Sequence, residues 1–195
     1  HAALNLGFRL AREEIVVTVD ADTILLPETI RHLAAPFEDP TVDAVCGNVQ
    51  VGNVGTLLTS SQDLEYVTSQ SFDRRAFDTL NAIPVVPGAT GAWRRRTVLA
   101  VGGYSGQTLT EDADLTVSVL AHGGRVLFSP WARSITEAPA SARALFRQRF
   151  RWTFGALQTV WKHRRRLGHG RVGWITLPHI LIFQLDSRHA AGAAA

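Results

Sequence analysis

Residues 15–23 read Ile-Val-Val-Thr-Val-Asp-Ala-Asp-Thr, and this stretch decides how the fold is interpreted. Its first five residues form a largely apolar, β-branched run, which predicts a buried, parallel strand. Asp20 and Asp22 follow directly at the carboxyl end, where open α/β sheets bind their ligands. Two carboxylates there suit Mg²⁺ or Mn²⁺, which binds one or two carboxylates together with substrate phosphates. A polar loop after a buried strand explains the same residues, so both interpretations stay open at this point.

Segments with helical and with strand-like patterns alternate along the rest of the chain. Helices are expected over 1–14, from Pro27 to the 36–40 region, and over 56–80, 111–122 and 141–166. Further strands are expected over 42–51, 85–93 and 125–128. An apolar stripe in 56–80 consists of Leu57, Leu64, Val67 and Phe72. The alternation predicts an α/β layered domain.

Composition and charge narrow the class of protein. The 195 residues are 46% hydrophobic and 19% charged, which excludes a disordered chain and a collagen-like repeat. Residues 138–195 carry ten Lys and Arg residues against Asp186 alone, so this third is expected to face something anionic or the inner surface of a membrane. The apolar stretch 172–185 is shorter than the roughly 20 residues of a spanning helix. Cys46 is the sole cysteine, which excludes a disulfide framework and predicts a buried, inert thiol.

A second candidate site is Thr110-Glu111-Asp112, at the start of the expected helix 111–122. A carboxylate fixed at this position fits a general base. Acidic residues in a first helical turn also complement the helix dipole without any catalytic role. The cluster therefore leaves a functional and a structural interpretation open.

The third candidate lies on the expected helix 141–166. Gln148, Arg151 and Trp152 are spaced i, i+3 and i+4, so they share one face. The neighbouring apolar stripe consists of Phe146, Phe150, Phe154, Leu157 and Trp161. An aromatic plane beside a fork of donors is what a sugar ring and a diphosphate require. The stripe is expected to lie against the rest of the domain or in a membrane interface, with the basic run 162–166 among anionic headgroups.

Two other phosphate-handling folds share a strand followed by acidic residues, and the sequence argues against both. A haloacid-dehalogenase-type phosphatase needs a Lys and an acidic pair downstream. Lys162 is the sole Lys, and no Asp or Glu lies between Glu137 and Asp186. A P-loop NTPase needs a glycine-rich loop that ends in Lys and Ser or Thr, which this sequence lacks.

In order and combination, these motifs resemble glycosyltransferase family 2, and within it the processive, membrane-embedded synthases of cellulose, chitin, hyaluronan and poly-N-acetylglucosamine. The resemblance covers about residues 1–167 and is carried by residues 2–5, 19–23, 65–66, 86–89, 91–95, 102–104, 110–115 and 148–152. Non-processive members generally lack the Gln-x-x-Arg-Trp element at 148–152, so its presence favours polymer synthesis. Residues 73–77 and 137–139 look closest to the N-acetylglucosamine-polymer branch.

The resemblance implies roles for the acidic residues. Asp20 and Asp22 would hold the metal, Mg²⁺ or Mn²⁺, and the UDP diphosphate, with Asp22 the more direct ligand. Asp112 would be the base that deprotonates the acceptor hydroxyl, and Glu111 would support the site.

Roles for the remaining motif residues follow from the same resemblance. Gln148 and Arg151 would contact the acceptor end and the diphosphate, and Trp152 would stack on the acceptor sugar. The acceptor pocket would be shaped by Gly88, Ala89 and Gly91, because small residues let a glycan approach the backbone.

The implied fold is an α/β fold of the GT-A type, which binds nucleotide sugars on a mixed, mostly parallel sheet. Residues 1–140 would be a partial catalytic domain whose first nucleotide-binding strand precedes His1. An amphipathic interface helix is expected over 141–167, and the start of a membrane-associated region with a frayed tail over 168–195. The implied function is inverting transfer of a sugar, N-acetylglucosamine, from a UDP-sugar to a growing β-linked polysaccharide. The catalytic domain would lie on the cytosolic side of the plasma (inner) membrane, attached through flanking helices outside this sequence.

Two other functions stay open. A non-processive family-2 glycosyltransferase would add a single sugar to a lipid or a protein. A basic module would bind nucleic acid through 162–166 and Arg171. The sequence contains no nucleic-acid-binding motif, and a basic stretch beside a membrane segment explains the run equally well, so no nucleic-acid partner is expected.

Overall fold

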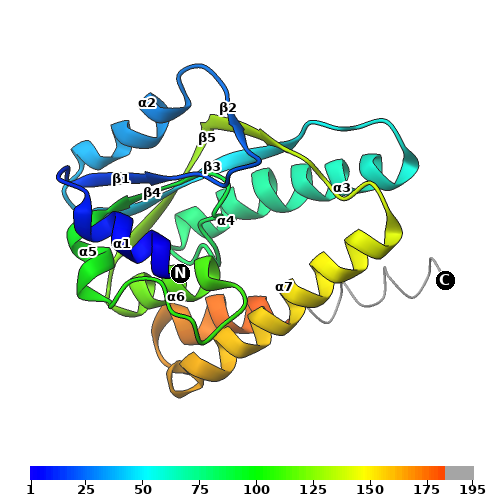
Figure 1. Cartoon of the computed structure of the whole chain (residues 1–195). Coiled ribbons are helices and arrows are strands. Elements are labelled where there is room, and N and C mark those ends of the chain that lie inside the picture. Colours follow the sequence, from blue (N-terminus) through cyan, green and yellow to red (C-terminus); the bar gives the residue numbers. More distant parts are fainter. Residues whose placement is uncertain (183–195) are drawn as a thin grey trace.

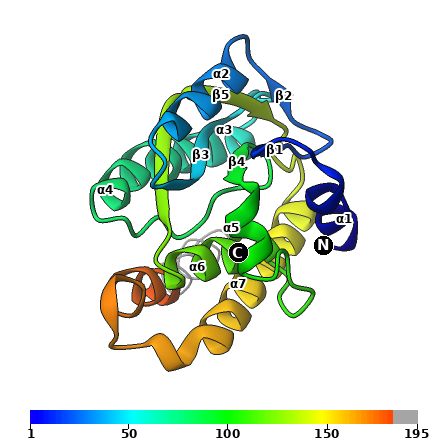
Figure 2. The same cartoon turned by 90° about the vertical axis from the view of Figure 1, so that its left-hand side faces the viewer.

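The computed structural model describes residues 1–182, without the side chains of residues 69–71. Within residues 1–182, five strands form one sheet in the order β1-β4-β3-β5-β2. The strands are β1 (Ile15–Thr18), β2 (Ile24–Leu25), β3 (Val42–Val51), β4 (Gly91–Arg94) and β5 (Arg125–Thr136). Helix α2 (Thr29–Ala34) covers one face, and α5 (Arg95–Ala100) and α6 (Glu111–Ala121) lie against the other, with α7 (Ala142–His163) outside α6 (Figures 1 and 2). The α/β layered domain is confirmed.

The directions of the strands differ from the expectation. The pair β3–β5 is parallel, whereas β1–β4, β4–β3 and β5–β2 are antiparallel. The mixed sheet is confirmed, but the predictions of a mostly parallel sheet and of a parallel strand at 15–19 were wrong. Ile15 and Val17 pack on one core cluster and Val16 on the other. The apolar run thus indicates that both faces of β1 are covered. It does not indicate whether the neighbouring strand is parallel or antiparallel.

The sheet separates two apolar clusters. The smaller cluster includes Leu33 of α2, and the larger one includes Trp93, Leu115 and Cys46. Cys46 is fully buried in β3, and burial raises the pKa of its thiol to about 11. A thiol held in this way is protonated at neutral pH, so the prediction of a buried, inert cysteine is confirmed.

Residues 57–79 form one continuous helical path, as expected, made of α3 (Leu57–Tyr66), the π-helix η2 (Val67–Asp73) and α4 (Arg74–Thr79). The apolar stripe of this segment is exposed, however: Leu57 is 88% exposed, Leu64 66%, Val67 54% and Phe72 76%. Two polar residues are buried instead. Gln62 donates from Nε2 to the carbonyls of Leu58 and Pro139 at 3.0 Å each, and Arg74 donates from Nη1 to the carbonyl of Gly47 at 3.0 Å. Hydrogen bonds to backbone oxygens therefore offset the burial of these nitrogen donors.

The bounds of the remaining helices and strands can be compared with the expected ranges. Helix α1 spans Ala2–Leu10, and short turns of helix cover η1 (Ala35–Glu38), η3 (Arg164–Arg166) and η4 (Val172–Thr176). Residues 85–90 form a loop before β4, and the strand expected over 125–128 continues to Thr136. Within residues 1–182, no helix is both long and apolar enough to cross a membrane. The expected frayed tail lies in 183–195, outside the described residues.

Candidate active site

A cavity of about 610 Å³ brings the three motif segments together. Nine of the ten residues that were expected to have a role in the site line it: Asp20, Asp22, Gly88, Ala89, Glu111, Asp112, Gln148, Arg151 and Trp152. Gly91 does not line this cavity, because it lies inside β4, opposite Thr18 of β1 and Cys46 of β3. A Cβ atom at Gly91 would come within 2.6 Å of the Val86 Cγ1 atom. The absent side chain therefore serves packing of the sheet rather than the shape of the cavity.

The acidic loop begins where β1 ends. The Thr23 amide donates to the carbonyl of Asp20 at 3.1 Å, which closes a turn after the strand. Burial raises the pKa of the Asp20 carboxyl, Asp22 and Glu111 raise it further, and Arg151 opposes them. These carboxylates are thus close enough to repel one another, with Arg151 as the facing cation.

The loop 85–90 covers this acidic turn from the other side. A Cβ atom at Gly88 would lie 2.9 Å from the Asp20 Oδ1 atom, so the absence of a side chain lets the carboxylate approach the loop backbone. Substituting Gly88 would push the Asp20 side chain away from its place in the cavity.

Asp112 lies in the first turn of α6 and is partly buried. Its Oδ1 atom accepts a hydrogen bond from the Ala113 amide at 2.8 Å. Burial raises the pKa of this carboxyl, although hydrogen bonds from the backbones of Ala113 and Gly88 oppose the shift, and the charge of Asp20 adds to it. The side chain is therefore a proton acceptor with a higher proton affinity than an ordinary aspartate.

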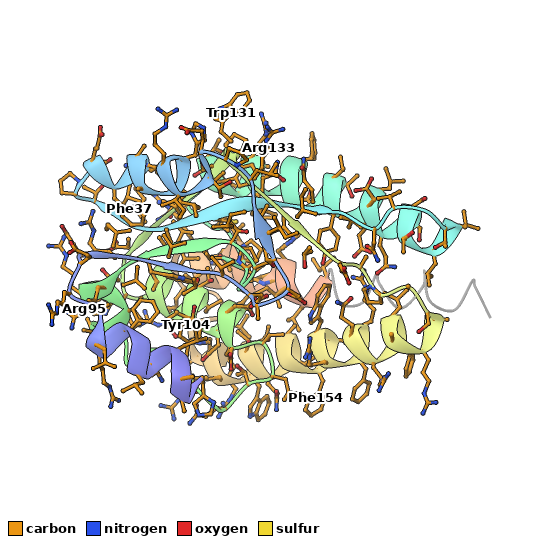
Figure 3. The ribbon with its side chains drawn as sticks, turned by 45° about the horizontal axis from the view of Figure 1, so that its top comes forward. Phe37, Arg95, Tyr104, Trp131, Arg133 and Phe154 are labelled. Carbon is orange, nitrogen blue, oxygen red and sulfur yellow. The ribbon has the colours of Figure 1, made fainter. Side chains whose placement is uncertain are left out.

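Helix α7 presents Gln148, Arg151 and Trp152 to the cavity, as the i, i+3, i+4 spacing predicts. Its apolar stripe is exposed: Phe146 67%, Phe150 61%, Phe154 47%, Leu157 39% and Trp161 68%. Figure 3 shows the Phe154 side chain directed away from the body of the domain. Of the two expected places for the stripe, packing against the catalytic domain was therefore wrong.

Two residues of the site carry a contact that the sequence reasoning did not assign. Glu65 on α3 forms a two-fold ion pair with Arg149 on α7, at 2.5 and 2.6 Å. The Arg149 guanidinium lies 4.9 Å from the centre of the Trp152 ring. Both residues fall within motifs that the sequence singled out, but 84 positions separate them, and no local pattern predicts that they meet.

A second group missed by the sequence reasoning joins α6 to the end of α7. Asp114, 1% exposed, accepts from Lys162 Nζ at 2.7 Å and lies 2.9 Å from His163 Nε2. Burial would raise the pKa of Asp114, but the hydrogen bonds from His163 and Lys162 outweigh it and hold the pKa below its ordinary value. The expectation that the whole run 162–166 faces lipid headgroups was therefore wrong for Lys162, whose charge is paired inside the domain.

The carboxylates of the acidic loop fit a divalent cation only if a bound substrate supplies further oxygen ligands to that cation. Among residues 1–182, no three His, Cys, Asp or Glu side chains are placed to form a metal site of their own. Asp20 and Asp22 offer carboxylate oxygens in a cavity where carboxylates already repel one another. Hard oxygen donors that need a positive charge suit Mg²⁺ or Mn²⁺, with the remaining ligands coming from substrate phosphates.

Comparison with known proteins places these observations in a family. The sequence model for glycosyl transferase family group 2 matches residues 15–186. The poly-β-1,6-N-acetyl-D-glucosamine synthase of Staphylococcus aureus is 28% identical over 159 residues, which are 81% of this chain and 39% of the relative. The probable glycosyltransferase YdaM of Bacillus subtilis is 29% identical over 163 residues, covering 83% and 39%. The chain thus spans about two fifths of the length of the curated relatives that it matches.

Two solved structures show the same fold. A mannosyltransferase from Pyrobaculum calidifontis, in complex with GDP-mannose and Mn²⁺, aligns with a TM-score of 0.68 and 23% identity, over 100% of this chain and 55% of the other. GalNAc-T7 with UDP, GalNAc and Mn²⁺ aligns with a TM-score of 0.50 and 16% identity, over 70% and 30%. The expected GT-A fold is confirmed by these neighbours. With the family match extending over most of its length, this chain belongs to glycosyl transferase family group 2.

Proposed function

We propose that this chain is the catalytic domain of an inverting glycosyltransferase, which transfers N-acetylglucosamine from a UDP-sugar to a growing β-linked polysaccharide. The observation that carries the proposal is the convergence of the acidic loop, the start of α6 and the Gln-x-x-Arg-Trp face of α7 on one cavity of about 610 Å³. Similarity to a poly-β-1,6-N-acetyl-D-glucosamine synthase supports the sugar and the polymer.

In this proposal Asp112 accepts the proton of the acceptor hydroxyl while that oxygen attacks the anomeric carbon and the bond to UDP breaks. Burial raises the pKa of Asp112, which makes it a stronger base than an exposed aspartate once it is ionised. Glu111 lines the same cavity, where its carboxylate would add to the negative charge around the acidic loop. Asp22 and Asp20 would hold Mg²⁺ or Mn²⁺, which neutralises charge on the departing diphosphate when it is bound.

The remaining lining residues would bind the two substrates. Arg151 faces the acidic loop and, with Gln148, would contact the diphosphate and the acceptor end. The indole of Trp152 offers a plane on which an acceptor sugar can stack. Gly88 and Ala89 leave room for a glycan to approach the loop backbone.

The exposed aromatic stripe of α7 supports a place at a membrane surface. Phe146, Phe150, Phe154, Leu157 and Trp161 form an apolar face on a helix that ends in exposed arginines. Amphipathic helices with large apolar residues and basic ends bind the interface of anionic bilayers. We therefore place the domain on the cytosolic side of the inner membrane, with α7 parallel to the surface.

The test uses the full-length protein in membrane vesicles, with UDP-N-acetylglucosamine, and measures product length and released UDP. The proposal expects a long β-linked polymer, and Trp152→Ala should shorten the product more than it lowers hydrolysis of the donor. A wild-type protein that only ever adds one sugar would instead indicate the single-transfer glycosyltransferase. UDP affinity, measured by calorimetry, should depend on Mg²⁺ or Mn²⁺ and lose that dependence in Asp22→Ala. If the affinity is the same in EDTA, with metal and in the variant, the assignment of the metal site is wrong.

A further inference from the structure

We infer that Arg149 is a positioning residue for Trp152, and that Glu65 on the facing helix fixes Arg149 in place. The plane on which the acceptor sugar stacks is then set by α3 and α7 together rather than by α7 alone. The inference rests on the proposed role of Trp152 in acceptor binding, and it adds two residues to the site that no motif role covers.

The ion pair between Glu65 and Arg149 fixes the orientation of the guanidinium. Nη1 lies 2.5 Å from Oε1 and Nη2 lies 2.6 Å from Oε2, so two parallel hydrogen bonds join the groups. Such a two-fold pair constrains the plane of the guanidinium as well as its position. The side chains are 23% and 36% exposed, so solvent screens the pair only in part.

The indole of Trp152 lies against this fixed guanidinium. The Arg149 Cζ atom lies 4.9 Å from the ring centre, within the range of a cation–π contact. A Trp side chain has two rotatable bonds, and a contact to one ring face limits how far the plane can turn. Because Trp152 also lines the cavity, the ring is presented to a ligand in a restricted orientation.

Arg149 and Arg151 divide two tasks although they are neighbours in one motif. Arg151 lines the cavity together with Asp20, and its charge opposes the raised pKa of the Asp20 carboxyl. Both terminal nitrogens of Arg149 bind the Glu65 carboxylate instead. A diphosphate bound near Asp20 is therefore expected to meet Arg151, whereas Arg149 acts through the ring of Trp152.

The expected consequence is a change in acceptor binding without a change in donor binding. A ring that is free to turn must be ordered when the sugar stacks on it, and this ordering weakens binding. Loss of one partly exposed cation–π contact corresponds to about a fivefold change in an equilibrium constant. The Michaelis constant for the acceptor should rise by about that factor, with kcat nearly unchanged.

The experiment compares four variants of the full-length protein, with a short β-linked N-acetylglucosamine oligosaccharide as acceptor. Arg149→Gln and Glu65→Gln should raise the acceptor KM and leave the Kd for UDP unchanged, the first more than the second. The exchange of both residues, Glu65→Arg with Arg149→Glu, restores an ion pair but not the cation over the indole, so it should not restore the KM. Arg147→Gln is the matched control, because Arg147 is exposed on the same helix outside the cavity lining.

A double variant makes the test specific for positioning. If Arg149 acts through Trp152, Arg149→Gln should have no further effect on the acceptor KM in a Trp152→Ala background. Additive effects, a weaker Kd for UDP in Arg149→Gln, or behaviour equal to the Arg147→Gln control would each overturn the inference. A wild-type protein that transfers no sugar to the oligosaccharide would instead overturn the proposed function, so the two failures are distinguishable. Thermal unfolding of each variant shows whether a change in KM reflects a loss of folded protein.

Discussion

The two halves of α7 are held by different means. The first half, residues 142–154, contributes Gln148, Arg149, Arg151 and Trp152 to the cavity lining, is tied to α3 by the Arg149–Glu65 ion pair, and carries exposed aromatic side chains on its outer side. Residues 155–163 are packed on the start of α6. There the Gln158 side chain accepts from the Leu109 amide at 3.0 Å, and Lys162 and His163 both bind Asp114. One end of the helix is thus fixed to the element that carries Asp112, while the other end lines the cavity.

This difference indicates how the site is aligned. Since Asp112 and Asp114 belong to the same helix, the anchored half of α7 sets the distance between Asp112 and Trp152. The less buried half can then interact with an acceptor or a membrane surface without disturbing that distance. If the two halves are as separate as their contacts, substitutions in one half should leave the other half unchanged.

The largest effect is expected from Asp112→Asn, which removes the proposed proton acceptor on α6 and leaves both halves of α7 unchanged. Turnover should fall by about 10² or more, the usual range for loss of a general base. The Kd for UDP and the unfolding temperature should stay close to those of the wild type. Steady-state kinetics and calorimetry on the full-length protein measure all three quantities, and near-normal turnover in the variant contradicts the assignment.

The pH dependence of the wild type provides a second readout of the same base. Asp112 must be ionised to accept a proton, and burial raises its pKa. Activity should therefore fall as the pH drops through a value above that of an ordinary aspartate. The pH profile of kcat/KM measures this acid limb, and a limb at the ordinary aspartate value would show that another group controls it.

The next largest effect is expected from Asp114→Ala, which removes the contact between the anchored half and α6. Lys162 and His163 would lose their buried acceptor, and breaking the buried ion pair with Lys162 costs about 3 kcal/mol. Urea unfolding measures the loss, with the exposed Glu38→Ala as a control that should change stability little. Equal stability of the two variants would mean that the anchored half is held by packing alone.

The sign of the pH effect on stability follows from the same contact. The pKa of Asp114 is held below its ordinary value, so its pairing stabilises the fold above the pKa of an unfolded aspartate. That contribution is lost as the pH falls through the lowered pKa of the folded state. Unfolding curves measured below about pH 4 should show this loss in the wild type and not in Asp114→Ala.

A smaller effect is expected from Gly155→Ala, at the point where the two halves meet. A Cβ atom there would come within 2.6 Å of the Thr110 backbone nitrogen, so α7 must move away from the loop before Asp112. Overpacking of this kind costs about 1–2 kcal/mol. Gly7→Ala in α1 is the matched control, because nothing lies within 4 Å of the added atom and stability should rise slightly. Turnover should fall in Gly155→Ala alone.

The smallest effect on stability is expected from Phe150→Ser combined with Phe154→Ser, on the outer side of the first half. These rings are 61% and 47% exposed and stack on each other at 6.1 Å. Their loss should change the free energy of unfolding by no more than about 0.5 kcal/mol. Binding to vesicles that contain anionic lipid should fall clearly, as flotation assays can measure. Destabilisation as large as in Asp114→Ala would mean that the stripe packs within the protein.

The sequence predicted the site better than the sheet. Strand ends and helix faces follow local periodicity, so the positions of Asp20, Asp112 and Trp152 in one cavity were accessible from spacing and from the family resemblance. Strand direction depends on which segments pair, and the pairing of β1 with β4 joins residues that lie more than 70 positions apart. No local pattern carries that information.

The exposed face of α3 shows a second limit of hydrophobic periodicity. Leu57 and Leu64 lie on the outside, whereas Gln62 of α3 and Arg74 of the following α4 are buried because backbone carbonyls accept their hydrogen bonds. The partners of Gln62 and Arg74 lie on distant segments, around Pro139 and Gly47. A pattern of apolar residues predicts a buried face only where the burial of apolar surface decides the packing. In this helical segment, hydrogen bonds from polar side chains decide which face is buried.

The buried thiol of β3 gives the domain an internal reporter of sheet opening. Cys46 Sγ lies 3.8 Å from the carbonyl of Val85, at the base of the loop that lines the cavity. A thiol reagent reacts with the exposed thiolate, so it can label this chain only when β3 and the loop separate. The labelling rate then measures how often the sheet opens spontaneously next to the cavity. A nucleotide that binds only the closed form should slow the labelling in proportion to its occupancy.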